Sequence, residues 1–268
     1  MRIAIQGIAG SFHSQAAKLW NPDLSQEFHP TFRSVFEVVE SGDVEFGIVA
    51  IENTLHGPIN EVYRLLSEYG LWVCGEVRIP IELYLQMSTK GELSDIQAVY
   101  TQAPAFAQCE QWLNEYLPAV KRIETSDTAA AARDIGSRFN AALASAESAD
   151  LYYNKIVAGP CNPPGSYTRF VVITKPGNPE YDGDRTLLTI MNGHQDLPGI
   201  LYDALGILKD RGINLSKVDS HPRLGFDRQY MFYLDLECSL QKSLGVVSAL
   251  SDEGWWVRVL GSYSLTQA

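Results

Sequence analysis

Residues 46–58 read FGIVAIENTLHGP and join a buried strand to a polar end. The apolar run 46–51 is typical of a strand covered on both faces, and it stops abruptly at Glu52, Asn53 and Thr54. The Gly57-Pro58 pair then opens a helical pattern, because proline is tolerated in the first turn of a helix. Polar groups between a strand and a helix favour a ligand site, with helix capping as the structural alternative.

The same alternation of short apolar runs and helical patterns continues through the first 174 residues. It predicts an α/β fold with mainly parallel strands. Ser11 and Ser126 are the expected caps of two of the helices. The predicted strands are 2–6, 44–51, 96–100, 120–124, 141–144 and 167–174, and the helices include 11–20, 104–116, 128–138 and 147–152.

Composition changes at residues 175–184, KPGNPEYDGD, which are polar and rich in proline and glycine. Such a stretch is typical of a linker between separately packed units. The pattern beyond it predicts a βαββαβ unit of ferredoxin-like type. Its expected elements are strand 185–192, helix 198–210, strands 215–220 and 230–237, helix 240–252 and strand 255–261.

Charge and composition exclude several classes of protein. The 268 residues carry 32 acidic and 21 basic side chains, and the formal net charge of -11 repels nucleic acid and anionic membranes. No apolar run approaches the roughly 20 residues of a membrane span, and no apolar signal segment precedes the first strand, so we expect a cytoplasmic protein. Four scattered cysteines and five scattered histidines show no metal-ligand spacing.

Four polar clusters lie at predicted strand ends or helix starts. The Gly7 to Ser11 turn can hold an anion at a helix N-terminus, although it lacks a dinucleotide or P-loop fingerprint. Arg169 is either a solvated strand end or a partner for a ligand carboxylate. For each of the other clusters, helix capping or ordinary strand formation is the structural alternative to a ligand site. The remaining clusters are 52–54, 101–104 with Gln108, and 166–170.

Together these clusters resemble the prephenate dehydratases with a C-terminal ACT regulatory domain, over essentially the whole chain. Thr168-Arg169-Phe170 is the most specific piece. Two departures are Thr101-Gln102-Ala103-Pro104, where the family commonly has Ser-His-Pro-Gln, and Ser166, where it has asparagine. The matching segments are GSFHSQAA at 10–17, IENT at 51–54 with Gly57, Gln108-Cys109, and TRFVVI at 168–173.

The resemblance implies a dehydratase domain over residues 1–174 that is like a type II periplasmic binding protein. Its lobes would be 1–78 plus 160–174, and 79–159, followed by a linker at 175–184 and an ACT domain at 185–268. Glu52, Asn53 and Thr54 would form one wall of the cleft between the lobes. Thr168 would face them.

The family reaction converts prephenate to phenylpyruvate with loss of carbon dioxide and water, in phenylalanine biosynthesis, and needs no cofactor. By resemblance, Thr168 is the donor to the leaving hydroxyl, with Glu52 and Asn53 beside it in the catalytic set. Ser11 and Arg169 are the candidates for the substrate carboxylates, an inference from charge. The expected substrate-binding residues are Ser11, Thr54, Thr101, Gln108, Arg169 and Phe170.

The second domain is expected to bind L-phenylalanine as an inhibitor. ACT units often bind an amino acid between two copies, so the resemblance implies a homodimer or homotetramer. The family's Gly-Ala-Leu and Glu-Ser-Arg-Pro segments are both altered in this chain. The expected effector-binding residues are Gly199, Ile200, Leu201, Asp219, Ser220, His221 and Pro222.

Two alternatives remain open from the sequence. Arogenate dehydratase acts on the amino-acid analogue of prephenate and yields phenylalanine directly. A non-catalytic amino-acid sensor on the same fold is the other alternative, and the intact Glu52-Asn53 and Thr168-Arg169-Phe170 segments argue against it.

Overall fold

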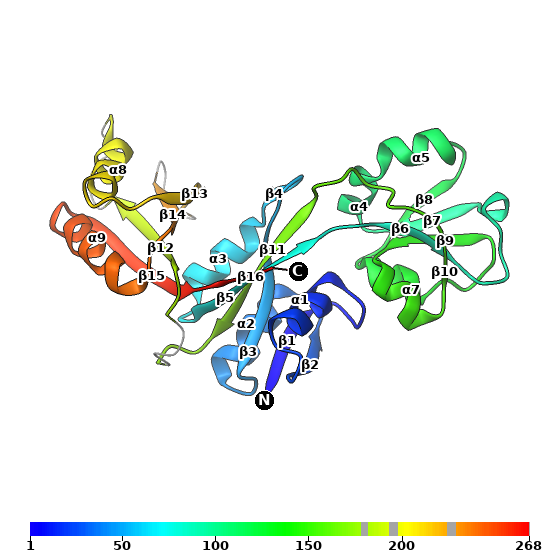
Figure 1. Ribbon diagram of the computed structural model, residues 1–268, viewed down its shortest axis with the longest axis horizontal. Helices are drawn as coiled ribbons and strands as arrows, with labels where there is room; N and C mark the ends of the chain where they lie inside the picture. The colour runs from blue at the N-terminus through cyan, green and yellow to red at the C-terminus, as the bar shows by residue number, and fades with distance from the viewer. Residues whose placement is uncertain (178–181, 193–197, 224–228, 268) are drawn as a thin grey trace.

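The computed structural model describes residues 1–177, 182–192, 198–223 and 229–267 (Figure 1). Its strands form two sheets, one of eleven strands and one of five. The larger sheet collects strands from both ends of the chain, whereas the smaller sheet is built entirely from the middle. The predicted linker at 175–184 lies partly outside the described residues.

The helices and strands have the following bounds. The helices are α1 Phe12–Trp20, α2 Phe32–Ser41, α3 Asn60–Glu68, α4 Ala103–Gln108, α5 Glu110–Tyr116, α6 Thr128–Arg133, α7 Ala146–Tyr152, α8 Ile200–Asp210 and α9 Leu240–Asp252. The strands are β1 Arg2–Gln6, β2 Ser25–His29, β3 Phe46–Asn53, β4 Gly57–Pro58, β5 Trp72–Pro80, β6 Tyr84–Met87, β7 Ala98–Thr101, β8 Lys121–Glu124, β9 Asn140–Ala144, β10 Lys155–Ala158, β11 Tyr167–Thr174, β12 Arg185–Asn192, β13 Leu215–Pro222, β14 Tyr230–Leu236, β15 Trp255–Tyr263 and β16 Leu265–Gln267.

The chain passes between the two sheets twice. It leaves the larger sheet after β5, builds β6 to β10, and returns through β11, which lies between β3 and β5. We call β1 to β5 and β11 with α1 to α3 the first lobe, and β6 to β10 with α4 to α7 the second lobe. This two-lobed α/β arrangement confirms the predicted fold class. The strands are less parallel than predicted, because β11 runs antiparallel to both of its neighbours.

The C-terminal elements follow the predicted βαββαβ order. Their strands are arranged β13-β14-β12-β15, and each neighbouring pair is antiparallel. Leu188 and Leu234 on one face of this sheet pack with Leu208 of α8 and Leu250 of α9. The unit is not separate from the first lobe, because both β15 and β16 pair with β5.

Two local predictions around the opening stretch are wrong. Strand β3 runs on through Glu52 and Asn53, and Gly57-Pro58 pairs back onto these two residues as β4 instead of opening a helix. The helix begins at Asn60. Further along, Asp127 rather than Ser126 caps α6, since its carboxylate accepts the N–H of Ala130 at 2.9 Å.

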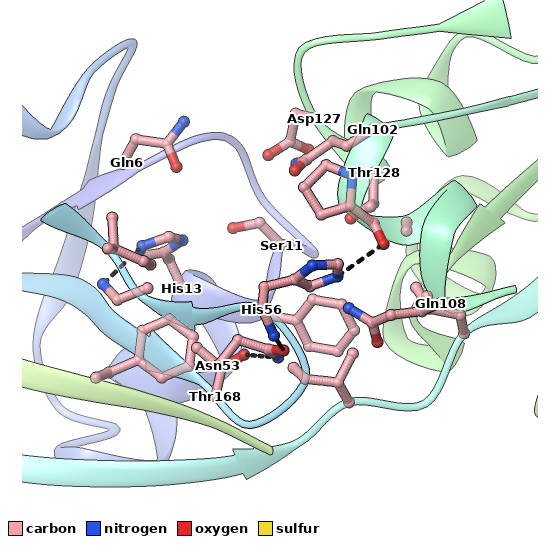
Figure 2. A pocket seen from close by; sticks show the side chains of 18 of the residues that line it. Gln6, Ser11, His13, Asn53, His56, Gln102, Gln108, Asp127, Thr128 and Thr168 are labelled. Atoms are coloured by element: carbon pink, nitrogen blue, oxygen red, sulfur yellow. Dashed lines mark hydrogen bonds between the residues drawn. The ribbon is translucent and has the colours of Figure 1, made fainter. Parts of the chain in front are cut away.

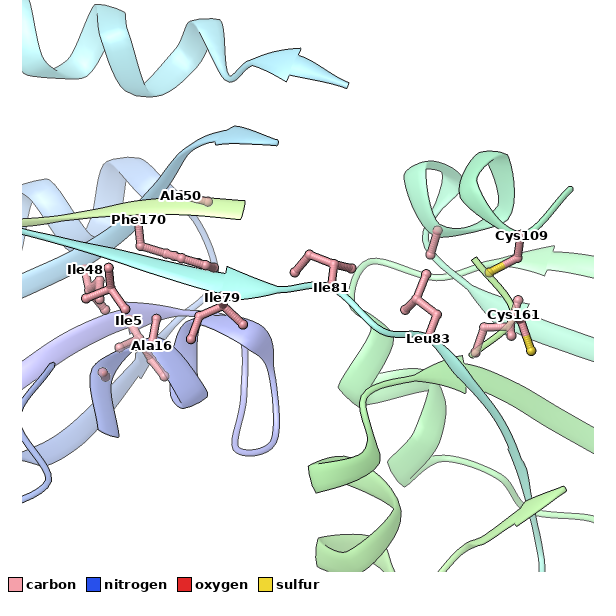
Figure 3. Close-up of a cluster of buried hydrophobic side chains, with 14 of the residues drawn as sticks. Ile5, Ala16, Ile48, Ala50, Ile79, Ile81, Leu83, Cys109, Cys161 and Phe170 are labelled. Carbon is pink, nitrogen blue, oxygen red and sulfur yellow. The ribbon is translucent and has the colours of Figure 1, made fainter. Parts of the chain in front are cut away.

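One apolar cluster links the lobes. Ile79, Ile81 and Leu83 on the first crossing segment lie between Phe170 of the first lobe and Cys109 of the second (Figure 3). The crossing is therefore packed on both sides, which holds the lobes at the edges of a common cavity. Among the described residues no helix is long and apolar enough to cross a membrane.

Candidate functional site

A cavity of about 250 Å³ lies where the two lobes meet (Figure 2). Phe12, Phe170, Ile81 and Leu83 supply much of its apolar lining. Its polar wall brings together residues from both lobes. The polar lining side chains are Gln6, Ser11, His13, Asn53, His56, Gln102, Gln108, Asp127, Thr128 and Thr168.

Asn53 and Thr168 form a fixed pair on the cavity wall. They are opposite each other in the β3–β11 ladder, and Asn53 Nδ2 donates to Thr168 Oγ1 at 3.0 Å. Asn53 Oδ1 accepts the N–H groups of Leu55 and His56, at 2.9 and 3.2 Å, which sets the orientation of the amide. Because the Thr168 oxygen already accepts a hydrogen bond, its own proton is available for a ligand.

His13 is a cavity residue that the sequence analysis did not single out. Its Nε2 accepts the Ala50 N–H at 3.2 Å, at the point where a β-bulge shifts the pairing of β3 with β11. A backbone N–H can only donate, so Nε2 has no proton and the neutral ring carries it on Nδ1. Burial lowers the pKa of His13 to about 3, and its ring packs edge-on against Phe170 at 4.9 Å. His13 is thus a fixed, uncharged group.

His56 connects the lobes across the cavity. Its Nε2 lies 3.0 Å from the Pro104 carbonyl at the start of α4, and a carbonyl accepts, so Nε2 donates. On the second lobe Gln108 accepts a hydrogen bond from Ser166 at 3.2 Å. Ser11 caps α1 by accepting the N–H of Ser14 at 3.2 Å, and because Ser11 and Phe12 both line the cavity, the positive end of the helix dipole lies at the cavity wall.

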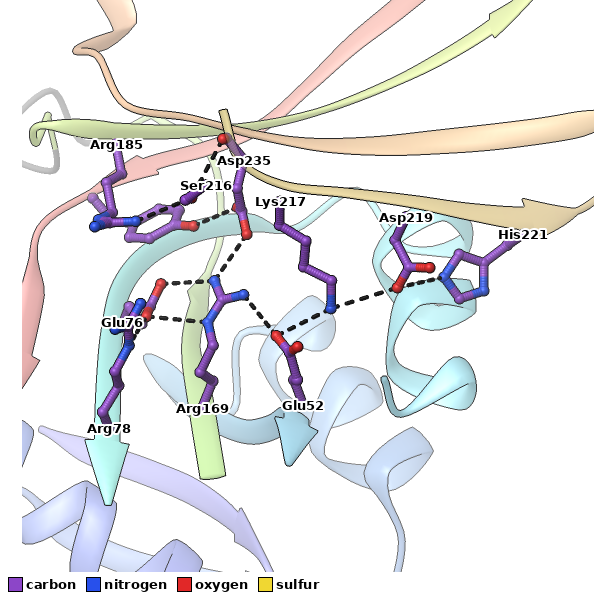
Figure 4. A network of polar contacts seen from close by, with 11 residues as sticks. Glu52, Glu76, Arg78, Arg169, Arg185, Ser216, Lys217, Asp219, His221 and Asp235 are labelled. Carbon is purple, nitrogen blue, oxygen red and sulfur yellow. Dashed lines mark hydrogen bonds and ion pairs between the residues drawn. The ribbon is translucent and has the colours of Figure 1, made fainter. Parts of the chain in front are cut away.

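Glu52 and Arg169 are adjacent to this pair in sequence but face the opposite side of the strands. Arg169 donates to Glu52 at 2.9 Å, to Glu76 of β5 at 2.8 Å and to Asp235 of β14 at 2.9 Å (Figure 4). Successive side chains of a strand point to opposite faces, which separates both residues from the cavity. The structure therefore corrects the predictions that Glu52 forms the cleft wall and that Arg169 binds substrate there.

This cluster joins the first lobe to the C-terminal unit. Lys217 of β13 lies 3.0 Å from Glu52, and both Glu76 and Asp235 have almost no exposed surface. Burial alone raises the pKa of Glu52 and Glu76, but neighbouring cations outweigh it and hold each pKa below its usual value: Lys217 and Arg169 for Glu52, and Arg169 and Arg78 for Glu76. Burial lowers the pKa of Arg169, but the carboxylates of Asp235 and Glu76 raise it by more, so the net pKa lies above its usual value.

Two other predicted binding residues have structural roles outside the cavity lining. Thr101 is fully buried and donates to the Leu143 carbonyl at 2.7 Å. Thr54 accepts the Tyr167 N–H at 2.9 Å and so ties the loop after β3 to the start of β11. Neither lines the cavity. Hydroxyl groups at strand ends satisfy backbone groups as readily as ligands, so sequence gave no means to separate these roles.

The predicted effector residues lie in two elements of the C-terminal unit. Gly199 is the residue before α8, with a left-handed φ of 86°, and Ile200 and Leu201 begin that helix. Asp219 and His221 of β13 face the first lobe, where the His221 ring packs against Tyr63 at 4.9 Å. Ser220 and Pro222 alternate with them and are exposed.

Five predicted residues thus meet at the cavity: Ser11, Asn53, Gln108, Thr168 and Phe170. Sequence reasoning missed His13, His56 and Asp127 as lining residues. His13 lies inside the quoted 10–17 segment, so the motif pointed to it, whereas Asp127 had no signal beyond its position before a helix. Within the described ranges no group of three or more His, Cys, Asp or Glu side chains is arranged to hold a metal ion.

A family model and a curated relative both name prephenate dehydratase. The prephenate dehydratase family model matches residues 3–178. A bifunctional chorismate mutase/prephenate dehydratase of Aquifex aeolicus (strain VF5) is 34% identical over 269 residues, covering 98% of this chain and 73% of that protein.

Two solved structures share the fold over nearly the whole chain. One is prephenate dehydratase from Arthrobacter aurescens in complex with L-Phe, with a TM-score of 0.87 and 26% identity over 98% of this chain and 90% of that one. The other, described as GqqA, a novel type of quorum quenching acylase, has a TM-score of 0.86 and 27% identity over 99% and 98% of the two chains.

Proposed function

The chain belongs to the prephenate dehydratase family, and from that premise we propose that it is a carbon–oxygen lyase that converts prephenate to phenylpyruvate for phenylalanine biosynthesis. The observation that carries the proposal is the Asn53–Thr168 pair, in which Thr168 accepts and so keeps its own proton available for a ligand in the cavity between the lobes. The reaction class needs such a donor where the ring hydroxyl departs.

The chemistry follows from charge flow in the substrate. As the C–CO2 bond breaks, its electron pair enters the ring, the C–O bond of the hydroxyl breaks, and the oxygen leaves as water once protonated. Thr168 donates a hydrogen bond to this oxygen, and because an alcohol is a weak acid it polarises the leaving group while solvent supplies the proton that makes it water. Aromatisation of the ring supplies the driving force.

Binding rests on neutral donors and on the first turn of α1. Ser11 and the α1 N-terminus favour one carboxylate through the free N–H groups and the helix dipole. Phe170, Ile81 and Leu83 are apolar neighbours of the cavity, and an apolar wall stabilises a departing carboxylate poorly, which assists its loss. Gln108 supplies a further hydrogen bond to orient the ring.

The proposal includes regulation through the C-terminal unit as an ACT domain over residues 185–268, after a dehydratase domain over 1–174. The ferredoxin-like strand order supports this. L-phenylalanine is the proposed effector, bound by the α8 start and by β13 between two copies of the chain in a homodimer or homotetramer. A cytoplasmic location is part of the same proposal.

The test is formation of phenylpyruvate from prephenate, followed by its ultraviolet absorbance, with purified wild type and Thr168→Ala. We expect turnover by wild type, a loss on the order of 100-fold or more in kcat for the variant, and inhibition by added phenylalanine. Thr168→Ser, which keeps the hydroxyl, is the matched control and should retain more activity than Thr168→Ala. Phenylalanine binding without turnover of prephenate or arogenate would instead establish the sensor alternative.

A further inference from the structure

The cavity wall carries one carboxylate and no lysine or arginine among the described residues. The carboxylate belongs to Asp127, the residue before α6. A substrate with two carboxylates brings further negative charge into this space. The charge of Asp127 is therefore expected to affect which substrates bind well.

Asp127 is held in place and reaches across the cavity. It is 6% exposed, and its Oδ1 accepts the Ala130 N–H at 2.9 Å. Its Oδ2 approaches the first lobe so closely that a Cβ atom on Gly7 would lie 2.8 Å from it. That glycine has a φ of +101°, so the turn before α1 leaves the carboxylate room.

No cation of the protein pairs with this carboxylate in the described part of the chain. Arg133, the cation that acts on Asp127 from the other end of α6, forms its ion pair with Asp134 at 2.7 Å. Burial raises the pKa of Asp127, and the N–H groups of Ala130 and Ala129 and the charge of Arg133 offset this effect only in part. A ligand ammonium would supply the missing partner.

The orientation of the substrate brings its variable group to Asp127. Figure 2 shows Asn53 and Thr168 on one side of the cavity, and Asp127 with Gln102 on the opposite side. The ring hydroxyl and the carbon that bears the side chain are at opposite corners of the six-membered ring. With the hydroxyl at Thr168, the side chain therefore extends toward Asp127.

We propose that the Asp127 carboxylate binds the ammonium of the amino-acid form of the substrate, arogenate, so that the site accepts arogenate in addition to the keto acid prephenate. The inference rests on the proposed function and names its substrate class. The two compounds differ at one position, where arogenate carries an ammonium and prephenate a carbonyl. The ammonium pairs with the Asp127 carboxylate, whereas prephenate leaves that charge unpaired beside a dianion.

The test compares kcat/KM for the two substrates in wild type, Asp127→Asn and Asp127→Ser. Asparagine and serine are both good helix caps, so α6 keeps its N-terminal hydrogen bond while the charge is removed. We expect the arogenate-to-prephenate ratio to fall at least about tenfold in both variants, as expected for loss of a charge-assisted hydrogen bond. Asp134→Asn removes the same charge at the exposed C-terminal end of α6 and should leave the ratio unchanged.

Other outcomes separate the two proposals. An unchanged ratio, or an equal fall in kcat/KM for both substrates, overturns the role of Asp127 in selectivity while the dehydratase assignment stands. If wild type converts neither compound, the proposed function fails and the selectivity falls with it. If wild type prefers prephenate and the arogenate-to-prephenate ratio of kcat/KM is unchanged in both Asp127 variants, the role of Asp127 is contradicted and the dehydratase assignment stands.

Discussion

The two faces of β3 and β11 carry adjacent residues in opposite environments. On the cavity face Asn53 and Thr168 are uncharged and joined by one hydrogen bond of 3.0 Å. On the other face Glu52 and Arg169 belong to a buried cluster of charges that reaches β14. The difference teaches that a step of one residue along a strand moves a side chain from the cavity to the interface between two units, so one short segment contributes to both.

The largest expected effect comes from removing the central cation of the charged face. Arg169→Met leaves Asp235 buried without its cation and Glu76 with Arg78 alone, and loss of one member of a buried ion cluster costs about 3–5 kcal/mol. We expect urea denaturation to give a free energy of unfolding lower by that amount, or a protein that does not fold at 25 °C.

Arg78→Met is the matched control for this change. Arg78 also binds Glu76, at 2.9 Å, but its side chain is 33% exposed. Partly exposed ion pairs contribute about 1 kcal/mol or less. If Arg169→Met and Arg78→Met lower the free energy of unfolding by equal amounts, burial does not explain the contribution of the Arg169 ion pairs to stability.

The cavity face is tested by Asn53→Asp. The carboxylate can still accept the N–H groups of Leu55 and His56, but it cannot donate to Thr168, and the threonine proton turns toward it instead. We expect kcat to fall by roughly 100-fold, as for loss of a general-acid interaction, with the melting temperature little changed. Wild-type kcat in this variant would show that the hydrogen-bond direction at Thr168 is irrelevant.

His13→Phe tests the support behind that face. Phenylalanine keeps the aromatic packing on Phe170 but leaves the Ala50 N–H at the β-bulge without an acceptor, which costs about 1–3 kcal/mol. Chemical denaturation measures this loss. His13→Gln can restore an acceptor and should recover part of the stability; equal loss in both variants would point to packing alone.

The smallest effect is the acid dependence contributed by Glu52. Its pKa is lowered in the folded protein, so its ion pairs stabilise the fold above its unfolded pKa of about 4.3 and are lost as pH falls through the folded value. The stability difference between wild type and Glu52→Gln should be greatest at pH 6 to 7 and shrink toward pH 3, as read from melting temperatures. Dehydratase activity in the variant should stay within a few-fold of wild type, and a 100-fold loss would return Glu52 to the chemistry.

The sequence predicted regular amphipathic elements well and the exceptions poorly. α9 and β12 have the predicted bounds, because polar residues flank each of these segments in the sequence. β5 was missed, since its buried Glu76 interrupts the apolar pattern and is stabilised only by cations from β5 and β11. Buried charges of this kind depend on contacts far apart in the chain, which a local pattern does not contain.

The candidate site was predicted to a similar extent. The motif brought Asn53 and Thr168 together correctly, but it treated Glu52 and Arg169 as their partners in the cavity. Once β3 is known to run through Asn53, the alternation of side chains separates the two pairs. The predicted strand ends two residues too early, at Ile51, and with Glu52 and Asn53 outside the strand nothing in the pattern separated their side chains.

The pairing of β16 with β5 has a consequence for protein engineering. Residues 265–267 return to the first lobe after the whole C-terminal unit has been built. In connectivity, the unit is therefore an insertion between β11 and β16 rather than an appendage. A stop codon in the linker would remove β16 together with the C-terminal unit, and so uncover the edge of β5 and expose the buried Glu76. Joining residue 174 to residue 264 through a short artificial loop would instead remove the unit and keep β16.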